Sequence, residues 1–280
     1  MSNFPLSDTE ISLFLEQALL EDLGDGDITC ALVIEDTATL TATMHARQDM
    51  VLAGLLLAER CFKQLDETAT FKKYVKDGDT VKAGMPIMTI HGKARALLSA
   101  ERVSLNIVQY LSGIATLTKD YMEQISHTKV KLLDTRKTLP SYRKLAKYAT
   151  QMGGATNHRM GLFDAVMIKD NHIAVVGDMA KAITAAKATG RKDVQVECDT
   201  LSQVSIALKA GADSLLLDNM DCETLKKAVA MVAGKIPLEA SGGVTLDTIK
   251  AIAETGVDYI SVGRLTSSAP AIDIGLDYSV

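Results

Sequence analysis

The feature that most constrains this chain is a series of short apolar runs that alternate with helix-like segments through its last two thirds. The runs are KLLD (131–134), DAVMIK (164–169), VQVEC (194–198), SLLLD (214–218), IPLEA (236–240) and YISVG (259–263). The segments 178–188, 200–210, 221–233 and 245–255 lie between the later runs and have helical periodicity. Strand–helix alternation of this kind predicts a parallel sheet, here a (β/α) barrel.

Capping residues support these helix limits. Residues that favour the N-cap precede the four helical segments, namely Asp178, Thr200, Asp221 and Thr245. Glycines stand where the helices should end, namely Gly190, Gly211, Gly234 and Gly256. The capping residues therefore support the alternation of strands and helices.

The first third of the chain predicts a different, mixed domain. A helix is expected over 7–23 with Ser7 as its N-cap, followed by strands at 38–46, 71–75 and 86–90. Turn sequences separate these strands, which favours a mostly antiparallel sheet. The chain as a whole is therefore predicted to be α/β, with an N-terminal α+β sandwich domain and a C-terminal barrel.

A polar stripe runs along the long helix predicted over 94–111. Ser99, Arg102, Asn106 and Gln109 recur at steps of three and four, so they share one face. The stripe is either a solvated surface or the lining of a site or interface. Ser, Asn and Gln are less usual than Lys and Glu on a merely soluble face, so both interpretations stay open.

Composition limits the kinds of partner. A net charge of -5 over 280 residues argues against non-specific nucleic-acid binding, which needs a basic surface. The start of the chain lacks the pattern of a signal peptide, and no apolar run approaches the ~20 residues of a membrane span. The four cysteines form no C-x-x-C pair. We therefore expect a cytoplasmic protein with reduced thiols and no membrane partner.

A charged residue stands at or just after the C-terminal end of each successive predicted strand. These residues are Arg136 and Lys137 beside Thr135, then Lys169, Glu197, Asp218, Glu239 and Arg264. In (β/α) barrels the carboxyl ends of the strands line the active site, so repeated charges there indicate a functional site.

The cations of this set point to a polyanionic substrate. Arg136, Lys137 and Lys169 are joined by His158 and Arg159, and arginine matches carboxylates and phosphates in bidentate geometry. The alternative is a stabilising network in which these cations pair with Glu197, Asp218 and Glu239. Such a network would require many charges to lose water without a ligand.

Two late glycine turns predict phosphate binding. Ser241, Gly242 and Gly243 precede the helix expected from Thr245, and Val262, Gly263 and Arg264 follow the last strand. Glycine lets backbone N–H groups approach an anion closely. Glu197 and Asp218 would repel phosphate, so they are interpreted as ligands of ribose hydroxyls or of Mg²⁺ bound to pyrophosphate.

Seven segments in order along the chain resemble the quinolinate phosphoribosyltransferase family, also called carboxylating nicotinate-nucleotide pyrophosphorylases. They are EDLGDGDIT (21–29), ERVSLNIVQYLSGIAT (101–116), DTRKTLPSYRKLAKYA (134–149), GGATNHRMGLFDAVMIKDNHI (153–173), GADSLLLDNM (211–220), LEASGGV (238–244) and GVDYISVGRLT (256–266). Two positions depart from the family pattern: Ser267 stands in place of a histidine, and Gln195 in place of a glutamate.

The resemblance implies an N-terminal sandwich over 1–112 and an open barrel over 113–269, with 270–280 packing back on the first domain. It implies a homodimer in which Arg102 reaches the partner's barrel. The implied quinolinate site comprises Arg102, Thr135, Arg136, Lys137, His158, Arg159 and Lys169. The implied site for phosphoribosyl pyrophosphate and Mg²⁺ comprises Lys169, Glu197, Asp218, Ser241, Gly242, Gly243, Val262, Gly263 and Arg264, with Arg136, Lys137, Glu197 and Asp218 as the catalytic residues.

The expected reaction joins quinolinate to a phosphoribosyl group and releases pyrophosphate and carbon dioxide, as a step of NAD biosynthesis. Lys137 is the candidate for delivering a proton after carbon dioxide leaves. Two alternatives stand beside it. One is a Schiff-base aldolase that uses Lys169. The other is a non-catalytic phosphosugar-binding relative, suggested by Ser267 and Gln195.

Overall fold

The computed structural model describes residues 4–279 of the chain, and these residues form two compact units. Unit 1 contains the chain up to Lys119, the segment Pro140–Gly154 and the chain from Ser268 onward. Unit 2 contains Asp120–Leu139 and Ala155–Ser267. The predicted α/β class, with an antiparallel N-terminal domain and an open C-terminal barrel, is confirmed.

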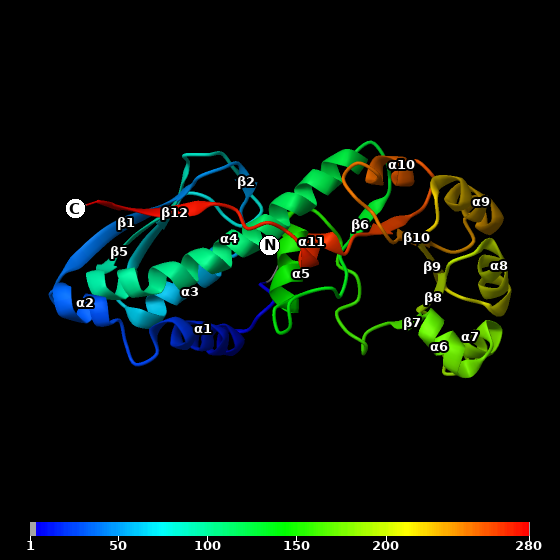
Figure 1. Cartoon of the computed structure of the whole chain (residues 1–280), viewed down its shortest axis with the longest axis horizontal. Coiled ribbons are helices and arrows are strands. Elements are labelled where there is room, and N and C mark those ends of the chain that lie inside the picture. Colours follow the sequence, from blue (N-terminus) through cyan, green and yellow to red (C-terminus); the bar gives the residue numbers. More distant parts are fainter. Residues whose placement is uncertain (1–3, 280) are drawn as a thin grey trace. The chain divides into compact units, whose positions relative to one another are not determined.

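Unit 1 is an antiparallel sheet with helices. The sheet order is β12-β1-β5-β3, and β2 pairs separately with β4. Its strands are β1 (Thr39–Ala46), β2 (Met50–Val51), β3 (Thr70–Lys73), β4 (Thr80–Val81), β5 (Pro86–Lys93) and β12 (Ile274–Ser279). Its helices are α1 (Asp8–Leu23), α2 (Ile28–Val33), α3 (Leu55–Leu65), most of α4 (Ala94–Ile125) and α5 (Arg143–Met152) (Figure 1).

Local sequence explains the first helix. The hydroxyl of Ser7 accepts a hydrogen bond from the backbone of Glu10, and the carboxylate of Glu10 accepts one from the backbone of Ser7. This capping box satisfies N–H groups that have no partner within the helix. The predicted start of α1 is therefore confirmed.

The long helix α4 continues fourteen residues beyond the predicted end at Leu111. Gly113 lies within this continuation. Gly113 is required for packing within unit 1, since a Cβ there would lie 2.0 Å from the carbonyl oxygen of Pro270. The glycine admits a second backbone at close range rather than ending the helix.

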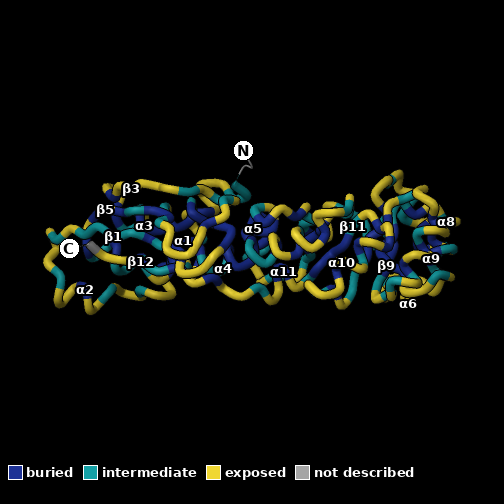
Figure 2. Tube along the Cα trace, turned by 90° about the horizontal axis from the view of Figure 1, so that it is seen from above, coloured by how far each residue is buried: buried dark blue, intermediate teal, exposed yellow. Residues whose placement is uncertain are grey.

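The core of unit 1 is aliphatic, as expected of a chain without tryptophan. Buried side chains from the sheet and from α1, α3 and α4 pack together. Figure 2 colours the trace of the buried residues dark blue. Leu15, Met44, Leu57, Met88 and Leu97 are fully buried. Burying such side chains stabilises the fold by about 1.5–3 kcal/mol each.

Unit 2 is a six-stranded parallel sheet in the order β6-β11-β10-β9-β8-β7, with helices in the connections. The strands are β6 (Lys131–Leu133), β7 (Val166–Ile168), β8 (Val194–Cys198), β9 (Ser214–Asp218), β10 (Leu238–Ser241) and β11 (Tyr259–Ser261). The helices are α6 (Asp170–Val176), α7 (Met179–Lys187), α8 (Leu201–Ala210), α9 (Cys222–Val232), α10 (Ile249–Ala253) and α11 (Arg264–Ser267). Because β6 and β7 are the two edges, the barrel is open between them.

Three of the four predicted N-caps in unit 2 are confirmed, and one is wrong. Asp178, Thr200 and Asp221 each accept a hydrogen bond from a backbone N–H in the first turn. The helix predicted from Thr245 starts only at Ile249. The hydroxyl of Thr248 accepts the backbone N–H of Thr245, which closes a turn that delays the helix.

No helix within residues 4–279 combines the length and the apolar character that crossing a membrane would require.

Candidate active site

The predicted site residues of unit 2 gather at the carboxyl edge of its sheet. Since all six strands run parallel, their carboxyl ends share one edge. The residues at or just beyond these ends are Thr135, Arg136 and Lys137 after β6, Lys169 after β7, Glu197 in β8, Asp218 in β9, Ser241, Gly242 and Gly243 at β10, and Val262, Gly263 and Arg264 at β11. Arg102 belongs to unit 1, where it lies exposed on α4.

The charges of Arg136 and Arg159 lie close enough to repel each other. Burial lowers the pKa of Arg159, and the neighbouring charge of Arg136 lowers it further. Arg159 donates to the carbonyl of Ala165 at 3.2 Å and to the sulfur of Met167 at 3.5 Å, which holds it against β7. The Nε of Arg136 is buried and has no hydrogen-bond partner among the described residues. Repelling guanidinium groups with an unused buried donor are typical of a site that binds an anion.

A fully buried carboxylate places the loop that carries His158 and Arg159. Asp134 follows β6 and accepts hydrogen bonds from the side-chain amide of Asn157 at 2.6 Å and from the backbone of His158 at 2.9 Å. The loop is therefore attached to the end of β6. The sequence showed Asp134 and Asn157 only as neighbours of the predicted residues, because their mutual contact joins segments 23 residues apart.

Lys169 and Glu197 form an ion pair between the ends of β7 and β8. Glu197 is 9% exposed, so the ammonium group of Lys169 compensates a nearly buried charge. Nε2 of His158 lies 3.1 Å from the carboxylate of Glu239 and forms a hydrogen bond with it. Among the predicted cations, the alternative of a stabilising charge network therefore describes Lys169. Among the described residues, Arg136 and Arg159 form no ion pair with a carboxylate.

The first glycine turn is shaped by a residue that the sequence did not single out. A Cβ on Gly242 would lie 2.1 Å from the side-chain oxygen of Asn219, and the backbone of Gly242 has a φ of +93°. The backbone of Asn219 is also in the left-handed region, and its side-chain amide donates a hydrogen bond to the carboxylate of Asp218 at 2.6 Å. A Cβ on Gly243 would meet nothing within 4 Å, so open space adjoins this turn.

The second glycine turn lies beside Lys137. A Cβ on Gly263 would lie 2.9 Å from Cδ of Lys137 and 3.5 Å from its Nζ. The carbonyl of Lys137 accepts the hydroxyl of Thr266 at 2.7 Å, which joins the two loops. The N–H of Val262 donates to the carbonyl of Leu133, so the backbone of Val262 serves the sheet.

The oxygen and nitrogen donors at this edge limit how a metal ion could bind. Residues 4–279 contain no group of three or more His, Cys, Asp or Glu side chains arranged to hold one. Mg²⁺ usually keeps several waters and is held by one or two carboxylates together with substrate phosphates. Glu197 and Asp218 therefore fit an ion that arrives with a phosphate ligand, rather than a cage built by the protein alone.

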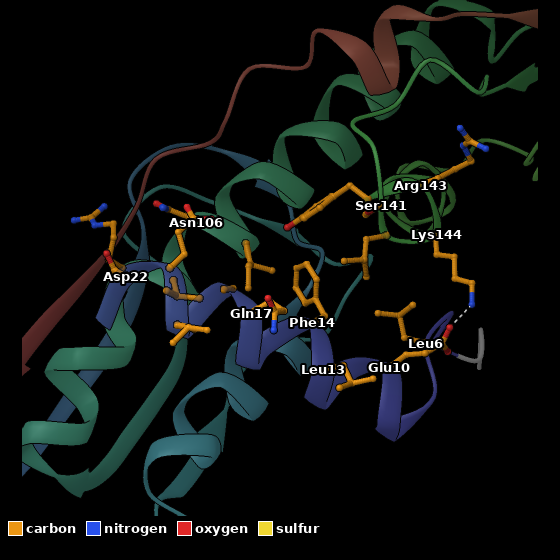
Figure 3. Close-up of a pocket in the computed structure, with 18 residues that line it drawn as sticks. Leu6, Glu10, Leu13, Phe14, Gln17, Asp22, Asn106, Ser141, Arg143 and Lys144 are labelled. Atoms are coloured by element: carbon orange, nitrogen blue, oxygen red, sulfur yellow. Dashed lines mark hydrogen bonds and ion pairs between the residues drawn. The ribbon is translucent and has the colours of Figure 1, made fainter. Parts of the chain in front are cut away.

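Unit 1 has a groove of its own, with a volume of about 1180 Å³, between α1, α4 and the segment 141–145 (Figure 3). Arg102 and Asn106 line it, whereas the other two residues of the polar stripe serve the interior of unit 1. Ser99 donates to Asp27, and Gln109 donates to the carbonyl of Ile274. The stripe therefore divides between a groove lining and internal contacts.

Fold and site together define an α/β-barrel protein that presents cations and glycine turns to a small anionic ligand. Residues 27–112 match the quinolinate phosphoribosyl transferase N-terminal domain, and residues 114–277 match the C-terminal domain of the same family. The chain belongs to the quinolinate phosphoribosyltransferase family.

Individual relatives agree with this assignment. A protein of Bacillus subtilis, named a probable nicotinate-nucleotide pyrophosphorylase (carboxylating), is 40% identical over 97% of this chain and 94% of its own. A chloroplastic protein of the same name from Oryza sativa is 42% identical over 95% of this chain and 77% of its own. The solved nicotinate-nucleotide pyrophosphorylase of Francisella tularensis superposes with a TM-score of 0.94, at 42% identity and 98% coverage of both chains. These names are those of transferases, and none supports the non-catalytic alternative.

Proposed function

We propose that this chain transfers a phosphoribosyl group from 5-phosphoribosyl 1-pyrophosphate to quinolinate, with release of pyrophosphate and carbon dioxide. The product is nicotinate mononucleotide, and the reaction serves NAD biosynthesis. The observation that carries the proposal is the pair of Arg136 and Arg159, whose mutual repulsion and unused buried donor are relieved by a dicarboxylate.

The residues around this pair complete the proposed quinolinate site. Thr135 and Lys137 adjoin Arg136, and Lys169 stands at the end of β7, the other edge strand. His158 precedes Arg159 in the loop anchored by Asp134. The two arginines and two lysines of this set supply more positive charge than one carboxylate needs, which supports a ligand with two.

The phosphoribosyl group is assigned to the strands on the other side of Lys169. Glu197 and Asp218 accept hydrogen bonds, so they suit ribose hydroxyls, and the turns at Gly242 and Gly263 suit phosphate. Glu197 and Asp218 would also hold Mg²⁺ indirectly. When bound, Mg²⁺ neutralises part of the charge that develops on the leaving pyrophosphate.

The chemistry then needs mainly position and charge. The pyridine nitrogen of quinolinate forms a bond to the anomeric carbon while the bond from that carbon to pyrophosphate breaks. The carboxylate next to the positive ring nitrogen then leaves as carbon dioxide, and the electron pair of the broken C–C bond stays on the ring carbon, where the adjacent positive charge stabilises it. A proton then replaces the carboxylate, and Lys137 is the candidate to deliver it.

A comparison of two arginine variants tests the quinolinate site. We expect Arg136→Ala to lower kcat/KM for quinolinate by at least about 100-fold, because removing one partner of a buried charge pair costs about 2–5 kcal/mol. Arg191→Ala is the matched control, since Arg191 pairs with Asp193 before β8 begins, at the opposite end of that strand from Glu197. Near-normal turnover of Arg136→Ala, or equal use of nicotinate and quinolinate by the wild type, would refute the assignment.

We also propose a homodimer in which Arg102 of one subunit completes the site of its partner. Each of the variants Arg102→Ala and Arg136→Ala should be inactive alone. Mixed subunits would form heterodimers with one intact site out of two, so random exchange should restore about a quarter of wild-type activity. Mixtures that stay inactive after demonstrated subunit exchange would contradict the shared site.

The cytoplasm is the proposed location. All four cysteines are free, and Cys30, Cys61 and Cys198 are buried. Unpaired buried thiols are usual where thiols are kept reduced.

The ion pair of Lys169 with Glu197 argues against the alternative of a Schiff-base aldolase. An ammonium group that donates to Glu197 is not the free amine that attacks a carbonyl.

A further inference from the structure

A chain of polar side chains in unit 2 connects β8 and β10 to the loop that carries His158 and Arg159. Glu239 lies on β10 and is only 3% exposed. Its Oε2 accepts hydrogen bonds from the side-chain amide of Gln195 at 2.7 Å and from Nε2 of His158 at 3.1 Å. Gln195 comes from β8, so Glu239 joins an interior strand position to the loop at the rim.

Glu239 is held as a carboxylate despite its burial. Burial alone raises the pKa of this group, but the hydrogen bonds that it accepts from His158 and Gln195 lower the pKa below its ordinary value. The amide of Gln195 must present its NH₂ group here, because a carboxylate only accepts hydrogen bonds. A second carboxylate at position 195 would instead face Glu239 with the same charge.

The contacts of the imidazole fix the tautomer of His158. Its Nδ1 lies 2.7 Å from the backbone nitrogen of Arg159. A backbone N–H can only donate, so Nδ1 must be the unprotonated acceptor. The ring proton therefore resides on Nε2 and points to Glu239, which accepts it. Both ring nitrogens are then used within the protein, one toward Glu239 and one toward Arg159.

This chain of contacts ends at the anion-binding arginine. The N–H of Arg159 is tied to the ring of His158, and its guanidinium group is held by Ala165 and Met167. The direction of the Arg159 side chain is thus fixed at both ends. If His158 lost Glu239, its proton could move to Nδ1, which would repel the N–H of Arg159 and release that end.

We propose that Glu239, supported by Gln195, is a positioning residue that fixes the tautomer of His158 and thereby orients Arg159 toward the quinolinate carboxylates. This inference rests on the proposed function for the identity of the ligand. Within the quinolinate site, His158 then acts on Arg159 through the backbone N–H of Arg159.

The tautomer can be measured without any substrate. The ¹⁵N chemical shifts of the histidine rings distinguish a protonated from an unprotonated nitrogen, and His158→Gln identifies the signals of His158 among the five histidines. We expect wild type and Glu239→Gln to show a neutral ring with the proton on Nε2. Glu239→Ala should show a mixture of tautomers. A wild-type ring protonated on Nδ1, or an unchanged spectrum in Glu239→Ala, overturns the proposal.

Steady-state kinetics gives the second test. Glu239→Ala should raise the KM for quinolinate by about tenfold and change the KM for phosphoribosyl pyrophosphate by less than about twofold. Glu239→Gln keeps an acceptor for both donors, so its KM should stay within about threefold of wild type. A quinolinate KM unchanged in Glu239→Ala, or a parallel rise of both KM values, overturns the positioning role.

Two further variants keep the test decisive. Gln195→Ala leaves the contact of Glu239 with His158 and removes only one donor, so its quinolinate KM should rise by about threefold; no rise would contradict the role of Gln195. Asp258→Ala is the matched control, because Asp258 accepts the backbone N–H of Leu238 at the opposite end of β10. It should lower thermal stability and leave both KM values unchanged.

The two proposals fail in different ways. Wild-type protein that turns over no quinolinate refutes the proposed function, while the tautomer measurement still decides the role of Glu239. Wild-type protein that is active but carries the proton on Nδ1 refutes the role of Glu239 alone.

Discussion

Replacing Asp134 by alanine should cost both stability and affinity for quinolinate. Asp134 is fully buried, and its two oxygens accept hydrogen bonds at 2.6 and 2.9 Å from Asn157 and His158. Hydrogen bonds to a charged group contribute about 1.5–3 kcal/mol each, and the donors left behind remain poorly solvated. A total loss of about 3–5 kcal/mol follows, because the two contacts share one loop and do not add fully.

Calorimetry measures this loss directly. In a chain of this size 1 kcal/mol shifts Tm by about 2–4 °C, so Asp134→Ala should melt about 6–20 °C below wild type. Asp213→Ala is the matched control: Asp213 accepts from Val194 and Lys187 before β9 begins, and it is only partly buried. The control should lose less stability and keep the wild-type KM for quinolinate.

Two separate results would contradict the roles predicted for Asp134. A Tm of Asp134→Ala within about 2 °C of wild type would refute the energetic role of the buried carboxylate. A clear fall in Tm with an unchanged KM for quinolinate would show that the loop of His158 and Arg159 keeps its geometry without this anchor.

Two further predictions concern the glycine turn and the first helix. Gly242→Ala should raise the KM for phosphoribosyl pyrophosphate by about tenfold or more, since its Cβ would meet Asn219 at 2.1 Å. Gly190→Ala has a similar positive φ but open space, so it should cost only the backbone strain of about 1–2 kcal/mol and leave that KM unchanged. Glu10→Gln should destabilise the protein at pH 7 and have little effect near pH 2 in urea unfolding. Lys144, first among the causes, lowers the pKa of Glu10 from 4.5 to about 2, so the contribution of this carboxylate is present above pH 4.5 and is lost as the pH falls toward 2. A difference between wild type and Glu10→Gln that stays constant over this range would contradict the pairing.

Much of the fold could be predicted because its signals are local. Apolar runs mark every strand of the barrel, and N-caps such as Asp178 and Thr200 satisfy backbone groups within three residues. The exceptions depend on distant partners. Gly113 resembles a helix end until the backbone of Pro270 is packed against it, and the turn at Thr245 delays a helix that periodicity alone would start earlier.

The candidate site also has a part that the sequence predicted and a part that depends on distant contacts. Charged residues at successive strand ends predicted that Arg136, Lys169 and Glu197 would share one edge, because parallel strands place equivalent ends together. The sequence could not tell which of these residues pair with each other and which remain available to a ligand. The role of Asn219 is seen only in the structure, where its side chain occupies the space that a Cβ on Gly242 would need.

The sequence by itself determined the succession of strands and helices, the edge at which the charges collect and the family of the chain. Only the tertiary structure decided which charges pair and which remain available to an anion. Lys169 is paired with Glu197, whereas Arg136 keeps a buried donor without a partner and repels Arg159. The physical reason is that pairing and desolvation depend on distances of a few ångströms between side chains far apart in the chain, and no local pattern encodes those distances.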